Sequence, residues 1–60
     1  MNEGDVVRLT HIRCDGKYEE DKGIEVGMIG KITEAGQMAS IVKFKEREAS
    51  MYNDTLEVIE

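Results

Sequence analysis

The chain has 60 residues, a charged fraction of 35% and a formal net charge of −5, with one cysteine and no proline. This length allows one domain, residues 1–60, with a small core and marginal stability. The composition excludes a membrane helix, because no apolar run approaches the roughly 20 residues that a span needs. The lone cysteine excludes an intrachain disulfide and, with no secretory signal at the first residues, predicts a cytoplasmic protein.

The first predicted strand is the β-branched run at residues 6–10. Strand alternation puts Val7 and Leu9 on the buried face and Arg8 on the opposite face.

Residues 11–22 follow without a sustained hydrophobic period, so we expect a long first loop and no amphipathic helix. Loops of this length tend to be functional, which makes the segment the first candidate for a working surface. Ile12 and Tyr18 are the side chains expected to anchor it.

The second predicted strand covers residues 25–34 and contains Gly27 and Gly30. Glycine inside a strand marks a bulge or the close approach of another backbone. A bulge at either glycine would bring both Ile29 and Ile32 to the core. The strand therefore predicts a sheet that bends sharply.

The remaining elements are a hairpin and two further strands. Residues 35–37 form the hairpin loop, in which Gly36 is expected to supply a positive φ. In the third strand, residues 39–45, Val42 and Phe44 point inward. The elements after it are a turn at 46–48, a strand at 49–52, a helical or tight turn at 53–55 and a closing strand at 56–59.

These elements predict an all-β fold, a small, strongly curved antiparallel barrel of about five strands with a long first loop. Its glycine and apolar skeleton reads Gly4-Asp5-x-Val7-x-Leu9, Gly27-x-Ile29-Gly30-x-Ile32, Val42-x-Phe44 and Leu56-Glu57-Val58-Ile59. With this skeleton the chain resembles the small SH3-like barrels of bacteria and their phages. In layout it is similar to the variable chain of ferredoxin–thioredoxin reductase and to the ferredoxin-docking SH3-like subunits of photosynthetic complexes. The resemblance implies an SH3-like barrel that serves as a binding module.

The segment His11-x-x-Cys14-Asp15 is the one arrangement that suggests site chemistry. A structural zinc site needs four ligands, commonly two pairs, and the chain has no second pair, so we expect no metal and no cofactor. A Cys–His nucleophile needs an orienting third group and a cleft that excludes water. A barrel filled by its own side chains leaves no such cleft, so we expect no enzyme.

The surface candidates are acidic and aromatic, and they favour a small cytoplasmic module that docks on a larger, basic protein. The predicted partner-binding residues are Tyr18, Glu19, Glu20, Asp21, Met51 and Tyr52. Two other interpretations stay open: a solvated loop kept soluble by its charge, and a phage-type acidic inhibitor or nucleic-acid mimic acting on a host enzyme that handles DNA or RNA.

A direct nucleic-acid interface is not expected, because the basic residues are few and have no aromatic platform beside them. These residues are Lys31, Lys43, Lys45 and Arg47. The small core also suggests a homodimer, in which an exposed edge strand pairs with its copy.

Overall fold

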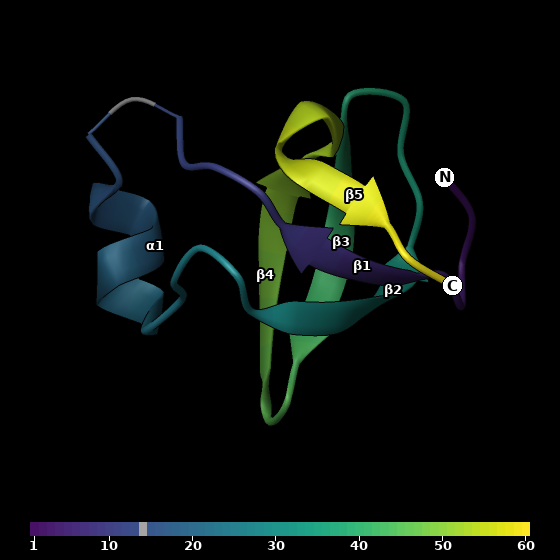
Figure 1. Cartoon of the computed structure of the whole chain (residues 1–60), viewed down its shortest axis with the longest axis horizontal. Coiled ribbons are helices and arrows are strands. Elements are labelled where there is room, and N and C mark those ends of the chain that lie inside the picture. Colours follow the sequence, from purple (N-terminus) through teal and green to yellow (C-terminus); the bar gives the residue numbers. More distant parts are fainter. Residues whose placement is uncertain (14) are drawn as a thin grey trace.

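The protein is built on a five-stranded antiparallel sheet with one short helix beside it (Figure 1). The structure is a computed structural model that describes residues 1–13 and 15–60. The elements are β1 (Val6–Leu9), α1 (Lys17–Lys22), β2 (Ile29–Glu34), β3 (Ala39–Phe44), β4 (Arg47–Tyr52), the 3₁₀ turn η1 (Asn53–Thr55) and β5 (Leu56–Val58). The strand order is β4-β3-β2-β1-β5, and each neighbouring pair is antiparallel. The prediction of a mostly β, antiparallel fold is confirmed, but the sheet is open, with β4 and β5 as its two edges.

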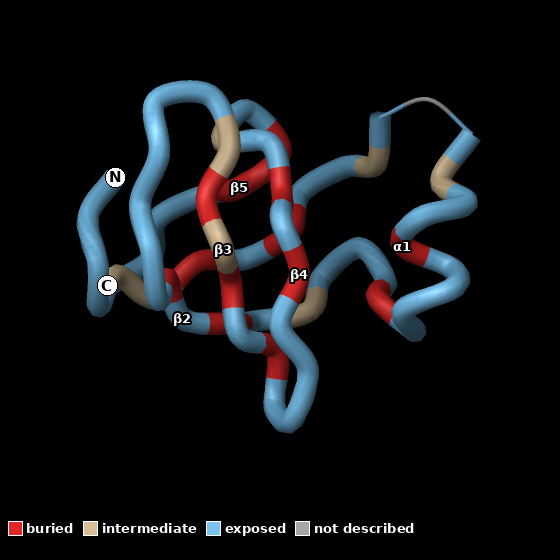
Figure 2. Tube along the Cα trace, turned by 180° about the vertical axis from the view of Figure 1, so that it is seen from behind, coloured by how far each residue is buried: buried red, intermediate tan, exposed pale blue. Residues whose placement is uncertain are grey.

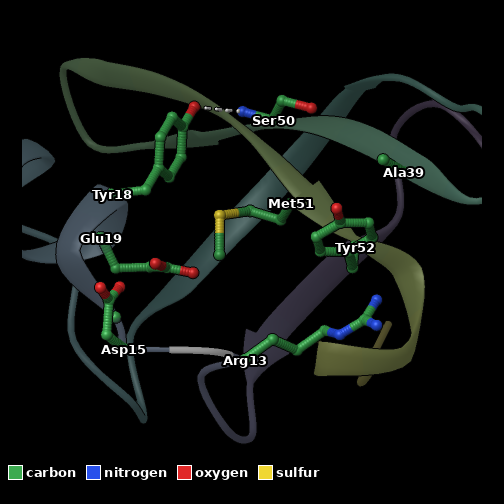
Figure 3. A pocket seen from close by; sticks show the side chains of 9 residues that line it. Arg13, Asp15, Tyr18, Glu19, Ala39, Ser50, Met51 and Tyr52 are labelled. Atoms are coloured by element: carbon green, nitrogen blue, oxygen red, sulfur yellow. Dashed lines mark hydrogen bonds between the residues drawn. The ribbon is translucent and has the colours of Figure 1, made fainter.

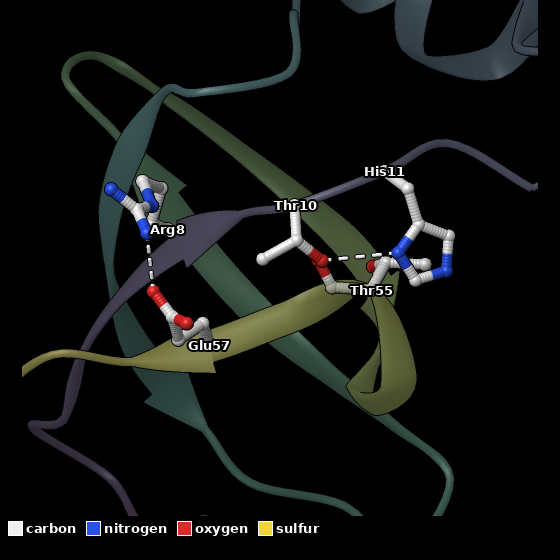
Figure 4. A network of polar contacts seen from close by, with 5 residues as sticks. All are labelled: Arg8, Thr10, His11, Thr55 and Glu57. Atoms are coloured by element: carbon white, nitrogen blue, oxygen red, sulfur yellow. Dashed lines mark hydrogen bonds and ion pairs between the residues drawn. The ribbon is translucent and has the colours of Figure 1, made fainter.

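Strand β1 lies in the sheet between β2 and β5, and its side chains alternate as predicted. Val7 and Leu9 are fully buried, whereas Arg8 lies on the opposite face and forms an ion pair of 2.5 Å with Glu57 (Figure 4). The alternation holds because one face of the strand packs on the core and the other meets water.

Strand β2 differs from its prediction in where it begins and in which residues it buries. It starts at Ile29, because Gly27, with a φ of 95°, belongs to a turn that precedes the strand. The irregularity in the β2–β3 pairing falls between Ile32 and Glu34. A bulge lies at Gly27, as one of the two predicted alternatives: the Gly27 N–H donates to the Leu9 carbonyl group at 2.8 Å and the Leu9 N–H donates to the Met28 carbonyl group at 3.0 Å, so two residues face one just before β2. Ile29 is nevertheless 54% exposed on the face it shares with Arg8, and only Ile32 enters the core.

Gly30 is the strand glycine, and the close approach predicted for such a residue is present. A Cβ at this position would lie 2.6 Å from Val42 Cγ1, 2.8 Å from the carbonyl oxygen of Lys43 and 2.9 Å from Phe44 Cδ1. Strand β3 therefore crosses β2 so closely that only hydrogen fits there.

The hairpin glycine Gly36 is required for a different reason from the predicted one, because it does not have a positive φ. Its missing side chain leaves space for the carbonyl group of Ala39, which a Cβ would overlap. In β3 the inward orientation of Val42 and Phe44 is confirmed. The next turn lies at Lys45 and Glu46, so β4 begins earlier than expected, and the predicted helical turn at 53–55 is confirmed as η1.

The long first loop contains the helix α1, which the sequence analysis did not predict. Gly16 and Gly23 flank it, both with a φ of 73° in the left-handed region. The Asp15 carboxylate accepts a hydrogen bond of 3.0 Å from the Lys17 N–H, and acidic residues occupy the first turn while Lys22 occupies the last. This charge order suits the helix dipole. A six-residue helix is too short to show a 3.6-residue period, so hydrophobic periodicity could not predict it.

The core lies on the inner face of the sheet (Figure 2), with the partly buried Ile12 and Met28 packed against it. Its buried apolar residues are Val7, Leu9, Ile24, Ile32, Val42, Phe44, Ala49, Met51 and Leu56. Ile12 thus anchors the first loop as predicted. None of the helices in the described part of the chain has the length and apolar character that a membrane span requires.

Candidate functional site

A groove of about 410 Å³ lies between α1 and the edge strand β4 (Figure 3). Helix α1 forms one wall, β4 forms the other, and residues that precede α1 close one end. The lining residues are Arg13, Asp15, Gly16, Tyr18, Glu19, Ala39, Ser50, Met51 and Tyr52. The groove therefore joins the first loop to the strand that ends at Tyr52, two segments that are far apart in the sequence.

The structure distributes the six predicted partner-binding residues over three hollows. Tyr18, Glu19, Met51 and Tyr52 line the groove together. Glu20 lines a second hollow with Ile12 and Ile24, and Asp21 lies beside Lys22 and Arg47 in a third. The acidic run is thus split by the turn of α1, which points successive side chains in different directions.

Tyr18 connects α1 to β4 through its hydroxyl group. The hydroxyl oxygen accepts a hydrogen bond of 3.1 Å from the Ser50 N–H, while 45% of the residue stays exposed. The Lys22 ammonium lies 5.5 Å from the centre of the Tyr18 ring. The ring is therefore held in place beside the groove and still offers surface to a partner.

Tyr52 forms the opposite aromatic wall and is 48% exposed. The guanidinium carbon of Arg13 lies 4.1 Å from the centre of its ring, and Arg13 also approaches the Asp54 carboxylate at 3.8 Å. A guanidinium over an aromatic face is a favourable cation–π arrangement. Arg13 was not among the predicted site residues, because it lies in a segment without hydrophobic periodicity.

Met51 is one of the predicted partner-binding residues, and the structure places it mainly in the core. Only 2% of the residue is exposed, and it packs with the other buried apolar side chains. It reaches the groove only as its floor, where its thioether lies between the two walls (Figure 3). Met51 therefore limits the depth of the groove.

Glu19 is the most unusual group in the groove, because it is a carboxylate on a residue that is only 9% exposed. Figure 3 shows its carboxylate directed toward Met51, with the Asp15 carboxylate on the same side of the groove. Within residues 1–13 and 15–60, no cation forms an ion pair with Glu19 and no donor forms a hydrogen bond with its side chain. Among the described residues no buried side-chain oxygen lacks a hydrogen-bond partner, so the Glu19 carboxylate oxygens face the open space of the groove.

The histidine of the predicted His11–Cys14 arrangement is exposed and lies away from the groove lining. Its Nδ1 atom is 3.0 Å from the Thr10 hydroxyl oxygen, which itself donates to the Thr55 carbonyl group (Figure 4). Cys14 lies outside the described residues, so both the metal and the nucleophile interpretations that include it stay untested. Among the residues that are described, no three His, Cys, Asp or Glu side chains gather as metal ligands.

The basic residues are placed by the sheet register. Lys31 and Lys43 are direct cross-strand neighbours, and Lys43 in turn faces Glu48. Arg47 is turned toward α1 and donates a hydrogen bond of 2.5 Å to the Lys22 carbonyl group. Only part of the basic set therefore lies together on the outer face of the sheet.

Comparison with known proteins adds no further assignment: the chain matches no protein-family model, no curated protein and no solved structure.

Proposed function

We propose that this chain is a small cytoplasmic binding module that docks on a larger protein through the groove between α1 and β4. The observation that carries the proposal is the pair of half-exposed tyrosines, Tyr18 and Tyr52, on opposite walls of one groove. Tyrosine and arginine are over-represented among the residues that dominate binding energies at protein interfaces, and Arg13 adds a guanidinium beside them.

Part of the groove is also preorganised, because one of its aromatic side chains is already ordered in the unbound chain. The stacking of Arg13 on Tyr52 holds that aromatic ring in a defined position. Side chains that are already ordered lose less conformational freedom on association. The floor is the buried Met51, so the surface that a partner meets rests directly on the core.

We further propose an SH3-like barrel as the fold that supports this groove. Three features favour it: β1 lies between β2 and β5, the single turn η1 joins β4 to β5, and β3 and β4 run across β1 and β5 (Figure 1). Strong twisting of this kind is how a small sheet encloses its own core.

The test is affinity capture with the tagged chain, followed by mass identification of the proteins retained. The informative bait is Tyr52→Ala, and the matched control is Ile29→Ala, which removes an exposed apolar side chain from a different face of the sheet. Truncation of a hot-spot tyrosine costs about 2 kcal/mol or more, which corresponds to a loss of about 30-fold in affinity.

We expect the proteins captured by the wild-type chain to be retained by the Ile29→Ala bait and lost from the Tyr52→Ala bait. Equal capture by the Tyr52→Ala bait would remove the groove as the docking site. The melting temperatures of all three baits are measured, so that a loss of folding is not taken for a loss of contact.

A further inference from the structure

The outer edge of β4 presents backbone groups toward the groove, and the pairing with β3 identifies which ones. Ala39 lies opposite Tyr52 and Ile41 opposite Ser50, and the Asn53 N–H bonds to the Met38 carbonyl group at 2.8 Å. In an antiparallel ladder, residue pairs whose backbone groups bond to each other alternate with pairs whose backbone groups do not. The backbone N–H and C=O groups of Asn53 and Met51 therefore point toward β3. The backbone groups of Glu48, Ser50 and Tyr52 therefore point away from the sheet.

Side chains of this chain already satisfy two of these outward groups. The Tyr18 hydroxyl accepts the Ser50 N–H at 3.1 Å, and the Thr55 hydroxyl donates to the Tyr52 carbonyl oxygen at 2.7 Å. The Tyr18 oxygen thus occupies the position in which a carbonyl oxygen of an added strand would accept the same N–H. In the described structure, no neighbouring strand covers this edge.

The charge at the groove restricts what such a strand would carry. Glu19 as a residue is only 9% exposed, its carboxylate is directed into the groove and has no cation partner among the described residues, and Asp15 lies beside it. A cation from outside the chain would neutralise this pair of carboxylates. Charge complementarity therefore favours a lysine or arginine side chain at that end of the groove.

From these observations we infer that the groove receives an extended segment of the partner, which adds to the edge of β4 as a strand and directs a basic side chain to Glu19. The incoming backbone replaces the Tyr18 hydroxyl on the Ser50 N–H, and the Tyr52 N–H offers the next outward donor along the edge. Main-chain pairing of this kind supplies affinity, and the side-chain site supplies specificity. This inference rests on the proposed docking function and specifies the form and the charge of the bound segment.

The test uses synthetic peptides and the complete chain, with binding followed by the amide signals of Ser50 and Tyr52 in ¹H–¹⁵N spectra. The probe is acetyl-Thr-Val-Lys-Val-Thr-amide, for which we expect a Kd of about 1 mM. Its two controls replace lysine by norleucine, which removes the charge, and N-methylate the backbone, which removes the ladder donors. We expect the norleucine peptide to bind about tenfold more weakly and the N-methylated peptide to show no binding.

Two substitutions test the two parts of the inference separately. Tyr18→Phe keeps the ring but frees the Ser50 N–H, so we expect it to bind the lysine peptide about fivefold more tightly. Glu19→Gln is expected to remove the preference for lysine over norleucine, whereas its matched control Glu20→Gln, with the same charge change on the same helix, keeps that preference.

Strand addition is wrong if Tyr18→Phe does not strengthen binding, if the N-methylated peptide binds as well as the parent, or if the parent peptide leaves both amide signals unmoved. The charge assignment is wrong if Glu19→Gln keeps the lysine preference. These failures are distinguishable from failure of the proposed function, because loss of partner capture by the Tyr52→Ala bait would still establish the groove as a docking site.

Discussion

Replacing Gly30 by alanine is expected to destabilise the protein strongly, because the added methyl group has no space. Its carbon would lie 2.6–2.9 Å from Val42 Cγ1, the Lys43 carbonyl oxygen and Phe44 Cδ1. The carbonyl group belongs to β3 and the other two atoms to buried side chains, so none of them can move without disturbing the core. Overpacking of this kind costs about 1–3 kcal/mol, and three simultaneous overlaps place the cost near 3 kcal/mol.

A loss of this size is large for such a short chain. Stability scales at roughly 0.05–0.15 kcal/mol per residue, which gives about 3–9 kcal/mol for 60 residues. In a domain of this size each kcal/mol shifts the melting temperature by about 4–8 °C, so Gly30→Ala is expected to lower it by about 12–24 °C. Thermal and urea unfolding followed by circular dichroism measure both quantities.

Gly27→Ala is the matched control, because a Cβ at Gly27 would meet no atom within 4 Å. Its cost arises only from the φ of 95° and is about 1–2 kcal/mol. A Gly30→Ala variant as stable as the wild type, or more stable than Gly27→Ala, would refute the close approach of β3 to β2. The double variant Gly30→Ala/Val42→Ala should lose less stability than the sum of the two single losses, because Val42→Ala removes the nearest of the three atoms while itself costing core packing.

Two further substitutions test other contacts of the fold. In a double-mutant cycle, Arg8→Ala and Glu57→Ala should show a coupling free energy of unfolding of no more than about 1 kcal/mol, because both side chains are about half exposed. A coupling free energy above about 3 kcal/mol would mean that the ion pair is desolvated in solution. Gly23→Ala should lower the melting temperature and speed amide exchange in α1, because its methyl group would displace the Arg47 guanidinium from the Lys22 carbonyl group and because its φ is 73°. Unchanged exchange in α1 would show that this contact does not hold the helix.

Much of the sheet could be predicted from the sequence, because a strand with one buried face alternates apolar and polar residues with a period of two. This period identified the inward residues of β1 and β3, such as Val7 and Val42. The start of β2 and the helix α1 could not be predicted in the same way. Glycine at position 27 serves a turn and glycine at position 23 ends a helix, yet both occur in an apolar sequence that resembles a strand.

Part of the set of predicted partner-binding residues is brought together by the structure, because Tyr18 and Tyr52 both line the groove. That a partner binds there stays a prediction. Arg13 and Ser50 were missed because their roles depend on the path of the loop and on the register of β4, which no local pattern encodes. Glu19 and Glu20 are adjacent in the sequence, and only the helix shows that one is buried and the other exposed.

The two left-handed glycines that flank α1 have a consequence for how such a protein can diversify. Gly16 and Gly23 set the direction in which the chain enters and leaves the helix, independently of most of the side chains between them. Exposed residues of α1 whose side chains form no hydrogen bond or ion pair with the sheet in the described structure, such as Glu20 and Asp21, can therefore be exchanged while the sheet remains the same. With the docking function proposed above, variation in α1 would let related chains bind different partners on the same sheet. The helix is also a short segment in which binding specificity could be changed by design.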